Sequence, residues 1–91
     1  MIKDPRPLYI IAADIASHWY NTHYTAKPYL DAMRELNSIN GEYGADSARD
    51  VVLYFLSNAS TFRGPEARRI KAELNDLLDT TQLEDTTDVP H

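Results

Sequence analysis

The sequence contains no cysteine and only three glycines in 91 residues, and its longest apolar run covers residues 51–56. Without cysteine the chain has no disulfide, thiolate metal ligand or cysteine nucleophile. So few glycines leave no glycine-rich loop of the kind that cradles phosphate. The apolar run is far shorter than the ~18 residues of a membrane span, and no basic region precedes an apolar stretch at the N-terminus. We therefore expect a cytoplasmic protein with no membrane partner.

Charge is unevenly distributed along the chain, although the formal net charge is only −5. Residues 63–71 contain four basic side chains and one acidic side chain. Beyond Lys71 there are six acidic residues and no basic residue. The C-terminal third therefore combines a basic strip with an acidic tail, which bears on the choice of partner.

Apolar residues recur at three- and four-residue spacing through most of the chain, the pattern of amphipathic helices. The predicted helices cover about residues 5–20, 26–43, 47–59 and 65–79. Their short, unequal lengths predict an all-α fold, a compact bundle of four orthogonally packed helices in one domain over residues 1–79. Residues 80–91 are rich in Thr, Asp and Glu and predict a disordered acidic C-terminal tail.

Local signals mark the ends of these helices. Asp4 can cap the first helix with Pro5 in its first position, and Ser47 can cap the third. Gly44 can take the left-handed position that follows a helix, which would end the second helix. Gly41 lies inside that helix and costs about 1 kcal/mol relative to alanine, so the helix could stop two or three residues early.

The run at residues 51–56 has the composition of either a buried strand or a buried helix, and periodicity alone does not distinguish them. We predict a helix, because Ser47 is a good cap and no second strand is available to pair with this segment. Since the run is apolar nearly all round, we expect this helix to be the central one.

Enzymatic chemistry has little support in the sequence. His18 and His23 are five residues apart, whereas ligands on one helix face need a spacing of three or four. Asp31 and Glu35 suit a solvated helix face better than an acid/base pair. We expect a protein that is not an enzyme, with no catalytic, cofactor-binding or metal site and no cofactor.

Aromatic residues are densest after the first helix. Trp19 continues the apolar stripe of that helix and is expected in the core, whereas Tyr20, His23 and Tyr24 leave the stripe. Tyrosines are favoured anchors in protein interfaces. In the alternative interpretation, the two tyrosines only close over one end of the bundle. The candidate protein-binding residues are Tyr20, His23, Tyr24, Phe62 and Arg63.

The basic strip offers a second candidate site. A helix-turn-helix protein would place the helix 65–79 in the major groove of DNA, with cations on phosphates. Few cations come from the other helices, and the acidic tail would compete for the strip. A solvated or tail-paired face and an acidic protein partner are the other interpretations. The candidate nucleic-acid-binding residues are Arg63, Arg68, Arg69 and Lys71.

Five stretches of the sequence invite comparison with a known family: YLDAM at 29–33, YGADSA at 43–48, VLYFLSNAS at 52–60, RG at 63–64 and ARRIKAEL at 67–74. In these stretches the chain resembles a family of small proteins encoded by tailed phages of actinobacteria. The resemblance covers about residues 8–78 and transfers no catalytic or binding residue. It implies a bacterial host cytoplasm as the working compartment.

Two functions follow from these patterns. The first is a non-enzymatic protein-interaction module, in phage terms a binder or modulator of a host or phage protein. It predicts that four side chains are exposed near a common surface: Tyr20, Tyr24, Phe62 and Arg63. The alternative is a small DNA-binding regulator that uses the helix 65–79. A homodimer is a further expectation, through an apolar patch of Ile10, Leu53 and Leu56.

Overall fold

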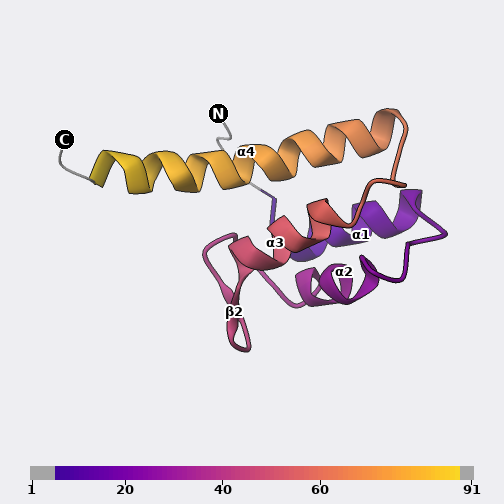
Figure 1. Cartoon of the computed structure of the whole chain (residues 1–91), viewed down its shortest axis with the longest axis horizontal. Coiled ribbons are helices and arrows are strands. Elements are labelled where there is room, and N and C mark those ends of the chain that lie inside the picture. The colour runs from indigo at the N-terminus through magenta and orange to yellow at the C-terminus, as the bar shows by residue number, and fades with distance from the viewer. Residues whose placement is uncertain (1–5, 89–91) are drawn as a thin grey trace.

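The computed structural model describes residues 6–88, with side chains to residue 79. Four helices and a two-stranded hairpin succeed one another there (Figure 1). They are α1 (Leu8–His18), α2 (Lys27–Met33), β1 (Glu42–Tyr43), β2 (Asp46–Ser47), α3 (Ala48–Ser57) and α4 (Pro65–Asp88). The predicted helical fold is confirmed in outline, but the hairpin makes the all-α description wrong in detail.

Helix α1 begins at Leu8, later than predicted, because acceptors distant in sequence take up its first N–H groups. The N–H of Leu8 donates to the carbonyl of Asn37 at 3.2 Å, and that of Tyr9 to the carbonyl of Leu36 at 2.9 Å. The first N–H groups of a helix have no partner within it, so the segment after α2 acts as their cap. The predicted cap, Asp4, lies outside the described residues.

Helix α2 is much shorter than the predicted helix over residues 26–43, since it ends at Met33. The chain then runs through turns, where the Ser38 hydroxyl accepts the backbone N–H of Asn40 at 2.9 Å. Such side-chain bonds to the nearby backbone compete with helical bonds. Asn37, Ser38 and Asn40 therefore favour turns over a continuation of the helix toward Gly41.

A hairpin replaces the rest of the predicted second helix. Strands β1 and β2 pair in antiparallel fashion, Glu42 opposite Ser47 and Tyr43 opposite Asp46. Gly44 has a φ of +61°, and in the described part of the chain only glycines have a positive φ. A two-residue turn with positive φ only at its first position is the type II′ turn of hairpins. Gly44 thus makes a hairpin turn and does not end a helix.

Helix α3 confirms the prediction that residues 51–56 are helical. The Ser47 hydroxyl accepts the N–H of Asp50 at 3.0 Å, which confirms the predicted cap. The side chains of Leu53 and Tyr54 are nevertheless exposed. One side of α3 therefore faces solvent, and its central place among the helices stays a prediction.

Apolar side chains from all four helices form one core, and no polar or charged side chain is buried among the residues with described side chains. Trp19 lies between two aromatic rings, with its centroid 6.2 Å from that of Phe55 and 5.0 Å from that of Phe62. The end of α1, helix α3 and the turn before α4 meet at these three rings. This contact fixes the end of the molecule that carries the candidate site.

Helix α4 continues to Asp88, past the predicted end at residue 79. Neither glycine nor a second proline interrupts the sequence between Pro65 and Asp88, so no residue forces the helix to stop. The structure thus differs from the predicted tail over residues 80–88, and residues 89–91 lie outside the described part. Figure 1 shows this end of α4 extending beyond the other helices. Within residues 6–88 no helix is both long and apolar enough to cross a membrane.

Candidate functional site

The cations of the predicted basic strip do not share one surface. Successive residues of a helix point about 100° apart, so Arg68 and Arg69 leave α4 in different directions. Arg69 faces α1, where acidic side chains surround it. Arg63, Arg68 and Lys71 instead line a pocket beside the turn before α4.

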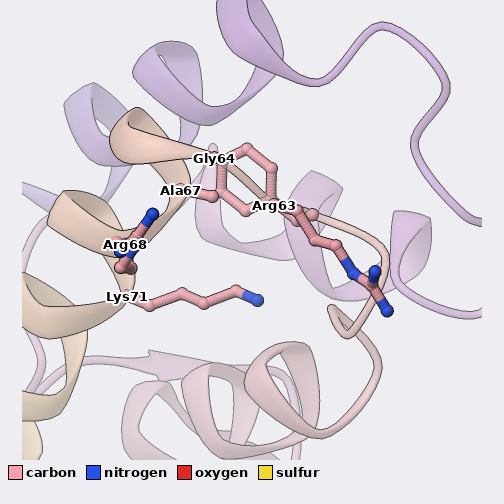
Figure 2. Close-up of a pocket in the computed structure, with 6 residues that line it drawn as sticks. Arg63, Gly64, Ala67, Arg68 and Lys71 are labelled. Carbon is pink, nitrogen blue, oxygen red and sulfur yellow. The ribbon is translucent and has the colours of Figure 1, made fainter.

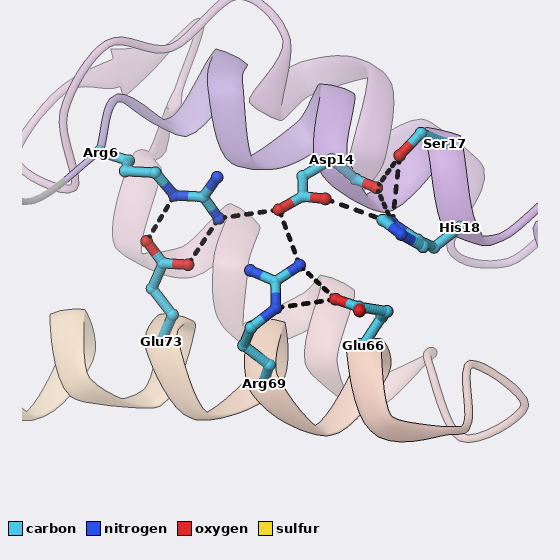
Figure 3. A network of polar contacts seen from close by, with 7 residues as sticks. All are labelled: Arg6, Asp14, Ser17, His18, Glu66, Arg69 and Glu73. Atoms are coloured by element: carbon cyan, nitrogen blue, oxygen red, sulfur yellow. Dashed lines mark hydrogen bonds and ion pairs between the residues drawn. The ribbon is translucent and has the colours of Figure 1, made fainter.

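Five charged side chains join α1 to α4 in what we call the clamp: Arg6, Asp14, Glu66, Arg69 and Glu73 (Figure 3). Arg6 donates two hydrogen bonds to Glu73, at 2.9 and 2.6 Å. Arg6 and Arg69 each donate to the same oxygen of Asp14 at 3.1 Å. Arg69 also donates to Glu66 at 2.8 Å. The clamp therefore has Asp14 at its centre, between two guanidinium groups.

The clamp favours the charged forms of Asp14 and Arg69. Burial raises the pKa of Asp14, but hydrogen bonds from Arg69 and Arg6 outweigh that effect, so the pKa lies below its ordinary value. The hydrogen bond to Glu66, followed by that to Asp14, raises the pKa of Arg69. Arg69 is thus engaged within the fold. The other three cations of the predicted nucleic-acid-binding strip, Arg63, Arg68 and Lys71, lie on a different face.

The pocket on that other face has a volume of about 260 Å³ and is open to solvent. Figure 2 shows Arg68 and Lys71 projecting from α4 on one side and Arg63 from the preceding turn on the other. No acidic side chain lines it. We call this the basic pocket, lined by Phe62, Arg63, Gly64, Ala67, Arg68 and Lys71.

Lys71 is the most enclosed of the three cations. Its ammonium group donates to the carbonyl of Ala59 at 2.7 Å and lies 5.8 Å from the centroid of the Phe62 ring. Burial lowers the pKa of Lys71, and the charge of Arg63 lowers it further. The pocket therefore brings positive charges close enough to repel one another, without an acidic residue in its lining.

The two arginines of the pocket are exposed and only lightly held. Arg63 donates from Nε to the carbonyl of Ser60 at 3.2 Å. Within the described part of the chain, no hydrogen bond or ion pair is found for the side chain of Arg68. Most guanidinium donors of both residues are consequently available to a ligand.

Phe62, predicted as an exposed binding residue, is buried, with 2% of its surface accessible. Its ring stacks on Trp19 with an angle of 19° between the planes, and its N–H donates to the carbonyl of Ala59. The prediction is therefore wrong for this residue. Phe55, Ala59 and Phe62 are spaced by four and three, so the apolar stripe of α3 continues into the turn and could have indicated the burial.

The aromatic residues after α1 are exposed as predicted. Helix α1 ends at His18, before the predicted residue 20, and the chain enters a loop. The exposed fractions of Tyr20 and Tyr24 are 88% and 79%. The ring of His23 stacks on that of Tyr24 at 4.8 Å, and its Nδ1 lies 2.8 Å from the hydroxyl of Thr25. We call Tyr20, His23 and Tyr24 the aromatic loop.

The aromatic loop and the basic pocket are neighbours. Trp19 directly precedes the loop, and it stacks on Phe62 of the pocket. In Figure 1 the connection from α1 to α2 and the turn from α3 to α4 lie at the same end of the molecule. Four of the five predicted protein-binding residues are exposed, and the segments that carry them lie at this end of the molecule. As a candidate for partner binding, we define the interaction surface as Tyr20, His23, Tyr24, Arg63, Arg68 and Lys71.

His18 and His23 lie in different surroundings. His18 lies beside Asp14 in α1, with 3.2 Å between Nδ1 and a carboxylate oxygen, while His23 belongs to the aromatic loop. Among the residues that the structure describes, no group of three or more histidine and acidic side chains is placed to hold a metal ion.

Comparison with known proteins gives no match to a family model, a curated protein or a solved structure.

Proposed function

We propose that this chain is a non-enzymatic protein-interaction module that binds its partner through the interaction surface. The observation that carries the proposal is the exposure of Tyr20 and Tyr24 in a loop that lies at the same end of the molecule as the turn carrying the exposed Arg63. Tyrosine and arginine are the residue types that most often dominate binding energy in protein interfaces. Exposed tyrosine rings, together with guanidinium groups around a pocket that no acidic side chain lines, are a favourable starting point for association.

Local contacts of the aromatic loop also support this function. The Thr22 hydroxyl donates to the carbonyl of Trp19 at 2.8 Å, which ties the loop to the end of α1. The N–H of Thr25 donates to His23 at 3.3 Å. A loop restrained in this way loses less conformational entropy when it binds, so more of the contact energy appears as affinity.

The resemblance to small proteins of tailed actinobacterial phages suggests where the partner is found. It supports a host or phage protein in the bacterial cytoplasm as the target. A phage protein of this kind would modulate its target by occupying a surface, since binding requires no chemistry from the module itself.

The experiment is a capture of bacterial host proteins on the immobilised full chain, with mass spectrometry to identify them. The test variant is Tyr20→Ser with Tyr24→Ser, and the matched control is Tyr9→Ser with Tyr43→Ser, two other exposed tyrosines. We expect a protein that the wild type and the control retain and the test variant loses. Recovery that is the same on all three baits would contradict the proposed surface.

A DNA-binding regulator is the second candidate, favoured by the convergence of Arg63, Arg68 and Lys71 on one pocket. The engagement of Arg69 in the clamp reduces its support. Each phosphate contact would contribute about −0.9 to the slope of log affinity against log salt. Duplex DNA binding that shows such a slope and weakens in Arg68→Ala would establish this function, and salt-insensitive or absent binding would eliminate it.

Self-association is a further proposal. Of the predicted apolar patch, Ile10 and Leu53 are exposed, whereas Leu56 is partly buried against the core. Sedimentation at two protein concentrations tests it: a mass that rises toward twice that of one chain supports a homodimer, and an unchanged monomer mass excludes one.

A further inference from the structure

We propose that the basic pocket binds a single carboxylate group from an acidic segment of the partner protein. This inference rests on the proposed function and names the chemistry that the partner presents. Three cationic side chains converge on the pocket and no acidic side chain lines it. An anionic group placed between them would replace mutual repulsion by attraction.

The donors of the pocket match a carboxylate in number and kind. Arg68 has no partner within the described residues, Arg63 has one backbone acceptor, and the Lys71 ammonium has one. A carboxylate offers about four acceptor positions and can receive an arginine in bidentate fashion. A water molecule takes about 30 Å³ in the liquid, so a pocket of about 260 Å³ has room for a carboxylate, part of its side chain and ordered water.

The surroundings favour a short acidic segment over a nucleic acid. Affinity for a nucleic acid comes from many phosphate contacts along a basic face. Here the fourth cation, Arg69, is engaged in the clamp, and α4 continues with exposed Asp76 and Asp79. A polyanion that followed the helix away from the pocket would therefore meet negative charge, whereas one localised carboxylate would not.

The apolar neighbours of the pocket indicate what accompanies that carboxylate. Phe62 and Ala67 contribute to the lining of the pocket but are themselves buried, so the exposed apolar surface at this end of the molecule comes from the rings of the aromatic loop. Apolar and aromatic groups gain most from contact with such surfaces. We therefore expect an acidic residue flanked by apolar or aromatic residues in the partner segment.

Selection from a random peptide library tests the inference, with the full chain as bait. The wild type is compared with two variants. The test variant carries both Arg63→Gln and Arg68→Gln, and the control is Arg34→Gln, which removes an exposed cation at the C-terminal end of α2. Aspartate or glutamate should be enriched beside apolar residues on the wild type and on Arg34→Gln, but not on the double variant. A selected peptide, synthesised, should bind about tenfold more weakly once its shared acidic residue becomes the amide.

The other outcomes separate this inference from the proposed function. Peptides without an acidic residue that require Tyr20 and Tyr24 but not the arginines would overturn the carboxylate site and leave the protein-binding function standing. Failure to enrich any peptide would overturn the carboxylate site. Salt-sensitive binding of DNA that requires Arg68, with no acidic peptide selected, would overturn both proposals in favour of the regulator.

Discussion

The first turns of α4 carry two arginines on different faces, and only one of them has carboxylate partners within the described residues. On the clamp face, Arg69 meets Asp14 and Glu66, and Arg6 meets Glu73, so each guanidinium has carboxylate partners. On the pocket face, Arg68 is the next residue along the chain, and no partner for it is found within the described residues. Side chains of one chemical type therefore serve the fold on one face and are available to a ligand on the other.

The two faces differ in whether their charged side chains have oppositely charged partners within the protein. Each charged group of the clamp has an oppositely charged partner within the protein, as expected of groups that stabilise a fold. In the basic pocket no acidic side chain offsets the cations, and burial, followed by the charge of Arg63, lowers the pKa of Lys71. Natural proteins break local rules mainly at functional sites. The pocket is accordingly the better candidate for function, and five predictions test the distinction.

The largest effect is expected for Phe62→Ala. The ring is buried and stacked on Trp19 beneath the interaction surface, so its removal leaves a cavity. We expect a loss of about 3–5 kcal/mol in the free energy of unfolding, measured by urea denaturation. Tyr20→Ala is the control, since that ring is exposed and should change stability by less than about 0.5 kcal/mol. Equal effects would mean that the two aromatic residues are not divided between core and surface.

Asp14→Asn should have the next largest effect, because it removes the charge at the centre of the clamp. Arg6 and Arg69 would each lose a charge-assisted hydrogen bond. We expect destabilisation of about 1.5–3 kcal/mol by urea denaturation. The matched control is Asp31→Asn, an exposed residue paired with Lys27 at 3.5 Å, for which less than about 1 kcal/mol is expected. A loss no larger than that of the control would show that the clamp does not stabilise the fold.

The clamp also predicts how stability depends on pH. Hydrogen bonds from Arg69 and Arg6, which outweigh burial, hold the pKa of Asp14 below its ordinary value of 3.8. The folded state therefore binds this proton less readily than the unfolded state, and the contribution of Asp14 is present above pH 3.8 and lost as the pH falls through the lower folded value. Urea denaturation should show the gap between wild type and Asp14→Asn narrowing below about pH 4. A gap that stays constant in acid would contradict the lowered pKa.

How much of the fold the sequence predicts depends on the length of its patterns. The long apolar stripes of α1, α3 and α4 were sufficient to predict those helices and most of the core. The hairpin is not predicted because Tyr43 fits both a helical period and a strand, and the apolar spacing continues past Gly41 as far as Tyr43. Turn chemistry decided the conformation there, since Gly44 favours a two-residue hairpin turn. Orthogonal packing of the helices stays a prediction.

The candidate site was predictable in its residue types but not in its division between faces. Departure from the apolar stripe was enough to place Tyr20 and Tyr24 at the surface. Which cations of residues 63–71 would meet acids depended on Arg6 and Asp14, far away in sequence. Contacts over such a separation follow from tertiary packing, which helical period alone does not contain. The clamp was therefore missed.

A smaller effect is expected for Lys71→Met, which keeps the apolar stem and removes the ammonium group. The variant loses the bond to the carbonyl of Ala59 but relieves repulsion with Arg63. These effects oppose each other, so we expect a change in the free energy of unfolding of about 1 kcal/mol or less. Binding of a selected acidic peptide should weaken about tenfold. A large loss of stability with unchanged peptide binding would assign Lys71 to the fold alone.

The smallest effect on stability is expected for Arg68→Gln, and this variant separates the two faces most directly. Because no partner of Arg68 is found in the described part of the chain, stability should stay within about 0.5 kcal/mol of the wild type, while peptide binding falls about tenfold. Its neighbour provides the reciprocal control: Arg69→Gln should lower the urea midpoint and leave peptide binding unchanged, because its bonds run to Asp14 and Glu66. If both variants weakened binding equally, the ligand would contact α4 across both faces, and the division between a stabilising arginine and a binding arginine would be wrong.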